Sequence, residues 1–221
     1  MRQFAVIGLG RFGSSVAKTL SEKGLQVLAV DTDENKVQDF SDIVTQSVCA
    51  DATDDKALKA IGMESVDVAV VSVGDNIEAS ILITLVLKEM GIKEVIAKAV
   101  TKDQGKALKK IGADRIIFPE RDMGTRLANS LASPHISELI ELSSNCSIME
   151  IKAPKEFIGK SLKQLNLRIE YGLNVVAIKS RNEKGEDTVN KVPEAEYKIR
   201  AQDRLMLVGP NENIKKLERK E

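Results

Sequence analysis

The sequence predicts an α/β protein with a doubly wound parallel sheet, followed by a connecting helix and a small α+β domain. Two observations indicate the sheet. The β-branched runs of the first half are near-continuous, as in strands that are buried on both faces. These runs alternate with helical patterns, as in a sheet covered by helices on both sides. A third observation, short alternating runs in the last third, indicates the second domain.

The composition limits the class of protein. The chain has 221 residues, and 43% of them are hydrophobic, enough for a large domain or for a larger and a smaller one. Its 33 Lys and Arg residues balance 33 Asp and Glu residues, so we expect no nucleic-acid partner. No apolar run approaches the ~20 residues of a membrane span, and no signal-peptide pattern opens the chain. We therefore expect a cytoplasmic protein.

The cysteines fit that compartment. Cys49 and Cys146 are too few and too scattered for a disulfide framework or a zinc cluster. Free cysteine often behaves as a small hydrophobic residue. We expect both side chains to be buried.

Six strands are expected in the first half, over residues 3–8, 26–31, 45–50, 67–73, 94–99 and 114–118. The helical patterns close on glycines that we expect to be left-handed, namely Gly24, Gly62, Gly91 and Gly112. Residues 56–62 and 106–112 have nearly identical sequences, which indicates that a βα unit recurs. The helix over residues 76–90 is apolar on more than one face. It is expected to pack against another subunit or, alternatively, to lie deep in its own domain.

A change of pattern follows Pro119. Met123, Leu127 and Leu131 are spaced at i, i+4 and i+8, which predicts an amphipathic connecting helix over 120–132, ending near Ser133. The alternating runs of the last third cover residues 148–152, 173–179 and 205–209. The expected division is a nucleotide-binding domain over 1–120, a crossover helix and linker over 121–137, and a C-terminal domain over 138–221.

The glycine motif lies between the first strand and the first helix. Gly8, Gly10 and Gly13 form G-x-G-x-x-G in the strand–turn–helix context that makes the sheet Rossmann-like. Gly8 permits a tight turn, Gly10 lets a phosphate approach the backbone, and Gly13 lets the helix pack close to the strand. The motif predicts a nucleotide site; the alternative is a flavodoxin-like turn without a ligand.

An acid and a base accompany the motif. Asp31 ends the second expected strand, where a carboxylate accepts hydrogen bonds from ribose hydroxyls and repels a 2′-phosphate. NAD or an adenine nucleotide is therefore favoured over NADP. Arg11 opens the first helix and is expected beside the phosphates, or else as a solvated surface residue.

Further candidates follow the other strands, because ligands of such sheets lie at the carboxyl ends of the strands. These are residues 51–53, residues 73–76, Lys98 and Glu120. Thr53 and Asn76 are alternatively the N-caps of the helices that follow. Lys98 is a charge at the end of an apolar strand, which a phosphate or a neighbouring carboxylate would explain.

No catalytic apparatus is evident in the sequence. The single histidine, His135, lies beyond the connecting helix and is expected at the surface. We therefore predict that the protein is not an enzyme and that its nucleotide is a signal. The alternatives are an NAD-dependent oxidoreductase and a stand-alone nucleotide sensor. A redox-sensing transcriptional repressor is a further alternative. It would need a winged helix and a basic face, and the net charge of zero argues against it.

The chain resembles the cytosolic RCK-domain subunits of the bacterial Ktr and Trk potassium uptake systems, the TrkA/KtrA family. The matching stretches are residues 4–13, 30–31, 51–53, 74–77, 98–99 and 111–120, the last followed by Arg121, Asp122 and Met123. The resemblance implies that ATP and ADP, or NAD and NADH, bias the shape of a homo-oligomeric ring of dimers, expected to be an octamer. The ring would dock beneath a membrane potassium transporter, at the inner face of the membrane.

The resemblance, with the motif, also implies the site residues. The expected cofactor contacts are Gly8, Gly10, Arg11, Phe12, Gly13, Asp31, Thr32, Asp33, Asp51, Ala52, Thr53, Val73, Gly74, Asp75, Lys98, Ala99 and Glu120. Glu120 is also implied to help hold a divalent cation, Mg²⁺ or Ca²⁺, beside the phosphates. In the C-terminal domain, Arg168 and Asn174 are similar to a site for cyclic di-AMP between two subunits.

Overall fold

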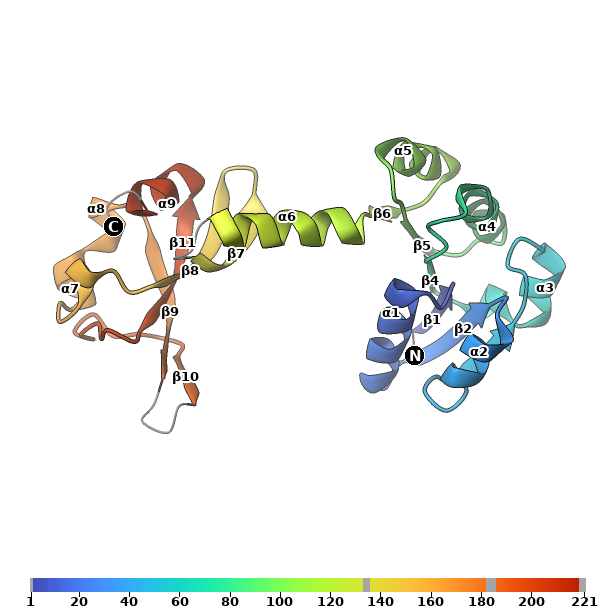
Figure 1. Cartoon of the computed structure of the whole chain (residues 1–221), viewed down its shortest axis with the longest axis horizontal. Coiled ribbons are helices and arrows are strands. Elements are labelled where there is room, and N and C mark those ends of the chain that lie inside the picture. The colour runs from blue at the N-terminus through green and yellow to red at the C-terminus, as the bar shows by residue number, and fades with distance from the viewer. Residues whose placement is uncertain (1, 133–135, 182–185, 219–221) are drawn as a thin grey trace. The chain divides into compact units, whose positions relative to one another are not determined.

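The computed structural model describes residues 2–132, 136–181 and 186–218 (Figure 1). The chain divides into two compact units, residues 1–122 and residues 123–221, which are called unit 1 and unit 2. Within the described ranges, no helix combines the length and the apolar character needed to cross a membrane.

Unit 1 contains the expected parallel sheet. Its strands lie in the order β3-β2-β1-β4-β5-β6, the order of a Rossmann fold. They are β1 (Gln3–Ile7), β2 (Gln26–Asp31), β3 (Gln46–Cys49), β4 (Val68–Val71), β5 (Glu94–Lys98) and β6 (Arg115–Ile117). Every strand that the sequence predicts in this half is present. The order reverses between β1 and β4, so the carboxyl ends of these two strands flank the topological switch point.

Helices cover both faces of this sheet. They are α1 (Arg11–Glu22), α2 (Glu34–Phe40), α3 (Asp55–Ala60), α4 (Ile77–Glu89) and α5 (Lys102–Ile111), with a 3₁₀ turn over Met63–Ser65. One core packs sheet residues against Leu58 of α3, Leu87 of α4 and Leu108 of α5. The other packs sheet residues against Ala17 of α1 and Val37 of α2. Burial on both faces is the reason for the continuous apolar runs.

The helix ends agree with the expected glycine caps. Gly24, Gly62, Gly91 and Gly112 all have positive φ, at 74°, 79°, 81° and 114°. The left-handed conformation lets the chain turn from each helix into the following strand.

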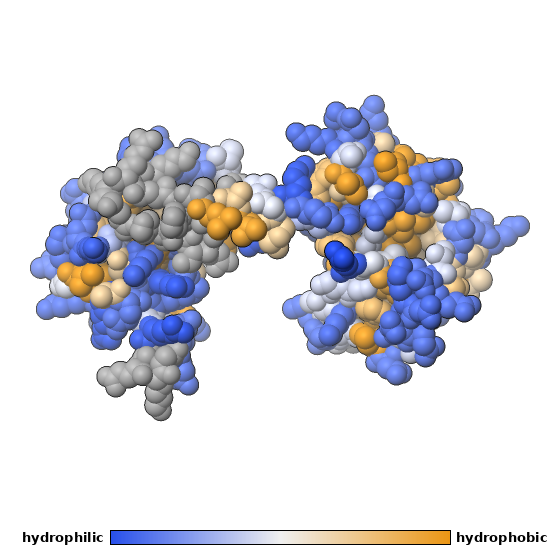
Figure 2. Space-filling model, viewed as in Figure 1, coloured by the Kyte–Doolittle hydropathy of each residue, from blue (hydrophilic) through white to orange (hydrophobic). Residues whose placement is uncertain are grey.

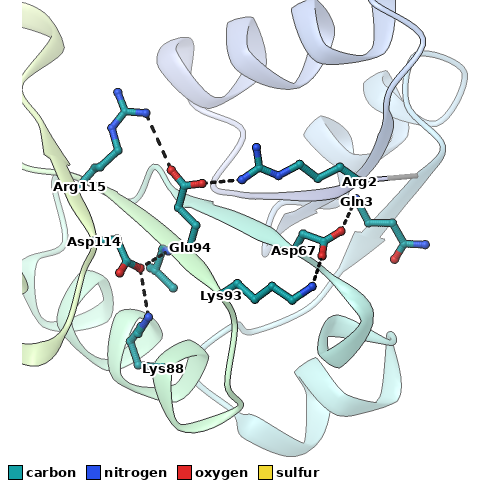
Figure 3. Close-up of polar contacts among 9 residues, drawn as sticks. Arg2, Gln3, Asp67, Lys88, Lys93, Glu94, Asp114 and Arg115 are labelled. Carbon is teal, nitrogen blue, oxygen red and sulfur yellow. Dashed lines mark hydrogen bonds and ion pairs between the residues drawn. The ribbon is translucent and has the colours of Figure 1, made fainter.

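Charged residues fix the amino ends of the strands (Figure 3). Asp67, just before β4, accepts from the N–H of Gln3 at 3.0 Å and from Lys93 at 2.6 Å. Asp114, just before β6, accepts from the N–H of Val95 at 2.7 Å and from Lys88 at 3.1 Å. The Val95 hydrogen bond is the main reason that the pKa of Asp114 lies below its usual value. Each carboxylate ties the start of one strand to its neighbour.

Unit 2 is built on an antiparallel sheet in the order β10-β9-β11-β8-β7. Its elements are α6 (Pro119–Ala132), which begins in unit 1, and β7 (Ile136–Ser143), β8 (Cys146–Lys152), α7 (Leu162–Leu165), α8 (Leu167–Glu170), β9 (Asn174–Arg181), β10 (Asp187–Asn190), β11 (Arg204–Pro210) and α9 (Asn211–Glu218), with a 3₁₀ turn over Lys155–Phe157. Helix α6 confirms the helix predicted over 120–132. The three alternating runs are β8, β9 and β11, whereas the sequence did not predict β7 and β10.

The prediction that both cysteines are buried is wrong. Cys49 is exposed and Cys146 is half-buried, and neither is in a disulfide. Cys49 is the last residue of β3, the edge strand of the sheet in the described part of the chain, where less of the protein covers a side chain than at the centre of the sheet. Its thiol lies 3.5 Å from the carbonyl oxygen of Thr32. Cys146 is the first residue of β8, at the end of its sheet, and is covered only in part.

Candidate functional site

The glycine-rich turn joins β1 to α1 at the carboxyl edge of the sheet, and its three glycines differ in what surrounds them. Gly8 has φ +94°, which the tight turn requires. A Cβ on Gly13 would lie 1.9 Å from the carbonyl oxygen of Gly8, so only glycine lets α1 pack this close. A Cβ on Gly10 would meet no atom within 4 Å. The backbone at Gly10 is therefore exposed to solvent and not covered by other parts of unit 1.

The start of α1 is also open. Gly10 is its N-cap residue, and the cap has no side-chain hydrogen bond. No acidic residue lies in the first turn, where Arg11 is exposed. Among the residues that the structure describes, Arg11 has no ion-pair partner. The unpaired N–H groups and this cation suit an anion such as a phosphate. Phe12 is half-buried against the core on the α1 side of the sheet.

Asp31 lies next to the glycine-rich turn. Its Oδ2 accepts from the N–H of Leu9 at 2.6 Å, and its Oδ1 accepts from the N–H of Asp33 at 2.9 Å. Asp33 itself caps α2 by accepting from the N–H of Asn35 at 3.0 Å. The carboxylate therefore holds together the turn after β1 and the turn after β2, which contains the exposed Thr32.

A lysine that the sequence analysis did not single out lies beside this acid. The Nζ of Lys36 is 3.6 Å from Oδ1 of Asp31 and 3.7 Å from Oδ2 of Asp33. The i,i+3 spacing of Asp33 and Lys36 on α2 is a sequence signal for the second pair. The sequence contains no comparable signal for the pair of Lys36 with Asp31.

The turn after β3 carries Asp51, Ala52 and Thr53. Asp51 Oδ1 accepts from the N–H of Thr53 at 2.9 Å and from its hydroxyl at 2.7 Å. These hydrogen bonds, the backbone one first, lower the pKa of Asp51. Thr53 is not the N-cap of α3; Asp54 takes that role by accepting from the N–H of Lys56. Ala52 is buried in the core.

The turn after β4 links the glycine-rich turn to β5. A Cβ on Gly8 would lie 3.0 Å from the side chain of Val73, and one on Gly74 would lie 3.0 Å from Cε of Lys98. Asp75 is exposed, and Asn76 caps α4 by accepting from the N–H of Ala79 at 3.0 Å, which was one of the two alternatives for it.

Lys98 ends β5 and is paired with a carboxylate. Its Nζ donates to Oε1 of Glu120 at 2.8 Å; the lysine side chain is 13% exposed and the glutamate side chain 69%. This pair lowers the pKa of Glu120. Of the two explanations considered for Lys98, the structure shows the neighbouring carboxylate. Ala99, the next residue, is fully buried, and its N–H donates to the carbonyl oxygen of Ile117.

The structure thus brings most of the predicted residues to the carboxyl edge of one sheet. Ala52 and Ala99 turn their side chains into the core, so only their backbone is available at that edge. Among the described residues, no three His, Cys, Asp or Glu side chains form a group that could hold a metal ion. Within the described part of the chain, Glu120 therefore belongs to no such group. His135 lies outside the described residues.

In unit 2, Arg168 lies on α8 and Asn174 begins β9, and both are exposed. The short segment between them borders a shallow hollow. Its lining residues are Ile169, Glu170, Tyr171, Gly172, Asn213 and Lys216. Neither Arg168 nor Asn174 is in that lining.

The sheet order, the G-x-G-x-x-G turn and the acid that ends β2 define a Rossmann-type nucleotide-binding unit joined to an α+β unit. The TrkA-N domain model matches residues 4–119, and the TrkA-C domain model matches residues 146–220. The chain belongs to the TrkA/Ktr family of potassium uptake proteins.

Individual relatives match almost end to end. The Ktr system potassium uptake protein C of Bacillus subtilis (strain 168) is 42% identical over 219 residues, covering 99% of this chain and 97% of the relative. Protein A of the same system and organism is 42% identical over 217 residues, covering 98% and 96%. The solved GsuK channel bound to NAD has a TM-score of 0.65 at 17% identity, covering 98% of this chain and 39% of that chain. The last likeness supports the fold.

Proposed function

We propose that this protein is the nucleotide-binding regulatory subunit of a bacterial potassium uptake transporter, acting at the cytoplasmic face of the membrane. The observation that carries the proposal is the bare backbone at Gly10 beside the Asp31 carboxylate. Packing does not require a glycine at position 10, which supports a ligand at this place. The relatives, which are named for potassium uptake, support a role of that ligand in potassium transport.

The ligand is an adenine nucleotide, ATP or ADP, or alternatively NAD or NADH. A diphosphate would lie against the N–H groups that open α1, where Arg11 is available, and the ribose would lie near Asp31. Lys98 offers a second cation at the same edge. Glu120 would contribute one carboxylate to a Mg²⁺ or Ca²⁺ ion whose remaining ligands come from phosphate oxygens and water. The resemblance of Arg168 and Asn174 extends the proposal to cyclic di-AMP in unit 2.

Assembly into a ring of dimers, an octamer, follows from the same resemblance and is supported by exposed apolar residues. Helix α4 exposes Ile77, Leu82 and Leu85 by 47%, 41% and 40%. Helix α6 exposes Met123, Leu127 and Leu131 by 61%, 59% and 72%. Figure 2 shows apolar surface over the α4–α5 region of unit 1 and along α6. Burial of such surface between copies would stabilise an oligomer.

Regulation requires two states of the oligomer with different affinities for the ligand, because a ligand shifts an equilibrium only by that difference. Nucleotides held at the edge of the sheet would bias the transporter through the ring. The chemistry of the nucleotide is not used in this scheme, which is why we assign no catalytic residue.

The experiment that tests the proposal compares thermal melts of the full chain with ATP, ADP, NADH and cyclic di-AMP. A ligand present at 100 times its dissociation constant stabilises the folded state by about 2.7 kcal/mol. We expect ATP and ADP to raise the melting temperature. Failure of all four ligands to do so would contradict nucleotide binding.

Two further measurements separate the alternatives. Co-purification with a Ktr- or Trk-type membrane subunit distinguishes the regulatory subunit from a stand-alone sensor. Turnover of NADH with a small carbonyl compound would instead indicate an oxidoreductase, and we expect none.

A further inference from the structure

The Lys98–Glu120 ion pair connects the candidate site with the helix that leaves unit 1. Lys98 is the last residue of β5, and Glu120 lies in the first turn of α6. The Nζ–Oε1 distance is 2.8 Å. The ammonium is largely buried while the carboxylate is mostly exposed, so the glutamate is the partner that has room to move.

Close contacts lead from the glycine-rich turn to this pair. A Cβ on Gly8 would lie 3.2 Å from the backbone of Ser72 and Val73. The next residue, Gly74, is so close to Lys98 that a Cβ there would lie 3.4 Å from Nζ and 3.0 Å from Cε. The 72–74 segment therefore has the glycine-rich turn on one side and the lysine on the other. A ligand that follows this segment from the glycine-rich turn would bring an anionic group to Lys98.

A phosphate and Glu120 then compete for one cation. The hydrogen bond from Lys98 is the main reason that the pKa of Glu120 lies below its usual value, so the carboxylate is ionised near neutral pH. Two anions beside one ammonium repel each other, and the low exposure of Lys98 limits the screening of that repulsion by water. The anion with more room to leave is Glu120.

We propose that Lys98 and Glu120 act as a reporter pair, in which an anionic group of the ligand takes Lys98 from Glu120 and thereby frees the first turn of α6. This inference rests on the proposed function, because it needs a phosphate ligand at the carboxyl edge. It adds the route by which occupancy of the site reaches the helix between the two units. Lys98 binds the ligand in this scheme, and Glu120 is a positioning residue that acts through Lys98.

The test measures ADP affinity of the full chain by titration calorimetry in EDTA, so that no divalent cation binds Glu120. Glu120→Gln removes the competing charge, and we expect ADP to bind about fivefold more tightly. Lys98→Met removes the shared cation, and we expect about tenfold weaker binding. In the double variant, Glu120→Gln should bring no gain, because its effect passes through Lys98.

Asp103→Asn is the matched control. Asp103 lies in the first turn of α5, just after β5, and pairs at 2.9 Å with Lys106 rather than with Lys98. This variant also removes one negative charge near the carboxyl edge, so a general electrostatic effect would raise its ADP affinity as well. We expect it to bind ADP like the wild type.

A second readout is hydrogen exchange over residues 119–123, where the N–H of Asp122 donates to the carbonyl oxygen of Phe118 at 2.8 Å. ADP should speed exchange there in the wild type, and the Lys98→Met variant should exchange fast without ADP. If ADP binds but neither Glu120→Gln affinity nor exchange at 119–123 changes, the reporter pair is overturned and the proposed function stands. If the wild type binds none of ATP, ADP, NADH and cyclic di-AMP, the proposed function itself is overturned, and this inference with it.

Discussion

The carboxylate of Asp31 accepts a hydrogen bond from the backbone N–H of Leu9 at 2.6 Å. The acid that ends β2 therefore fixes the turn that follows β1, twenty-two positions earlier in the chain. Its second oxygen, Oδ1, accepts a hydrogen bond from the N–H of Asp33 and so fixes the turn that follows β2. A residue predicted to bind ribose thus also shapes the site in which the ribose would lie.

Asp31→Asn is expected to weaken ADP binding about tenfold or more, because a neutral amide is a weaker acceptor and turns its NH₂ toward one of two backbone donors. Titration calorimetry of the full chain measures the effect. Asp39→Asn, an exposed acid on α2, makes the same change of charge and should bind normally. Equal affinity of the two variants would contradict the role of Asp31.

Gly10→Ala and Gly13→Ala separate binding from packing. Gly13→Ala should destabilise unit 1 by about 3 kcal/mol or more, because the new Cβ meets a backbone oxygen that cannot give way. Gly10→Ala should change the unfolding free energy by less than about 0.5 kcal/mol, since its Cβ has open space. It should nevertheless abolish the stabilisation by ADP, because the methyl group occupies the place of a phosphate. Urea unfolding with and without ADP distinguishes these outcomes, and normal ADP stabilisation of Gly10→Ala would count against the site.

Asp114 predicts a dependence of stability on pH. Its pKa is lower in the folded protein than its ordinary value, so ionised Asp114 stabilises the fold above that value. This stabilisation is lost as the pH falls below about 4 and through the folded-state pKa. The Asp114→Asn variant should be less stable than the wild type at pH 7 by about 1 kcal/mol. Its free energy of unfolding should fall less than that of the wild type when the pH is lowered. Urea midpoints across pH test this, with exposed Asp103→Asn as the control. A parallel acid profile for wild type and Asp114→Asn would refute it.

Asp203 is the corresponding test in unit 2. It is fully buried and accepts from the hydroxyl of Ser180 at 2.7 Å, the hydroxyl of Tyr197 at 3.0 Å and the N–H of Arg200 at 2.8 Å. Asp203→Ala leaves these donors without their acceptor and should destabilise unit 2 by about 3 kcal/mol or more. The chain has no Trp and two Tyr, both in unit 2, so tyrosine fluorescence follows this unit. Exposed Asp187→Ala is the control, and an unchanged Asp203→Ala midpoint would disprove the argument.

The exposed face of α4 predicts an effect on assembly. Leu85→Glu places a charge beside Leu82 on the apolar surface of that helix. If α4 packs against another copy, the molar mass in solution should fall while the circular dichroism spectrum stays the same. Light scattering after size exclusion measures the mass. Val189→Glu, on the exposed surface of β10, should leave the mass unchanged, and an unchanged mass for Leu85→Glu would show that this face is not an interface.

Much of unit 1 was predictable because each signal is local. A strand buried on both faces has an apolar run, and a helix that must turn back has a glycine at its end, as Gly62 and Gly112 show. The glycine spacing after β1 likewise predicted both the tight turn at Gly8 and the close packing at Gly13. Strands β7 and β10 carry weaker signals, because they are the edge strands of an antiparallel sheet and each pairs on one side only.

The sequence by itself determined which segments of unit 1 are strands and helices, which edge of its sheet collects the polar residues, and to which family the chain is similar. Only the tertiary structure decided that Asp31 binds the N–H of Leu9, that Lys98 pairs with Glu120, and that Cys49 is exposed. Periodicity reports whether a segment has apolar neighbours. It does not report which segments those are, because contacts between distant residues are set by the order of the strands in the sheet.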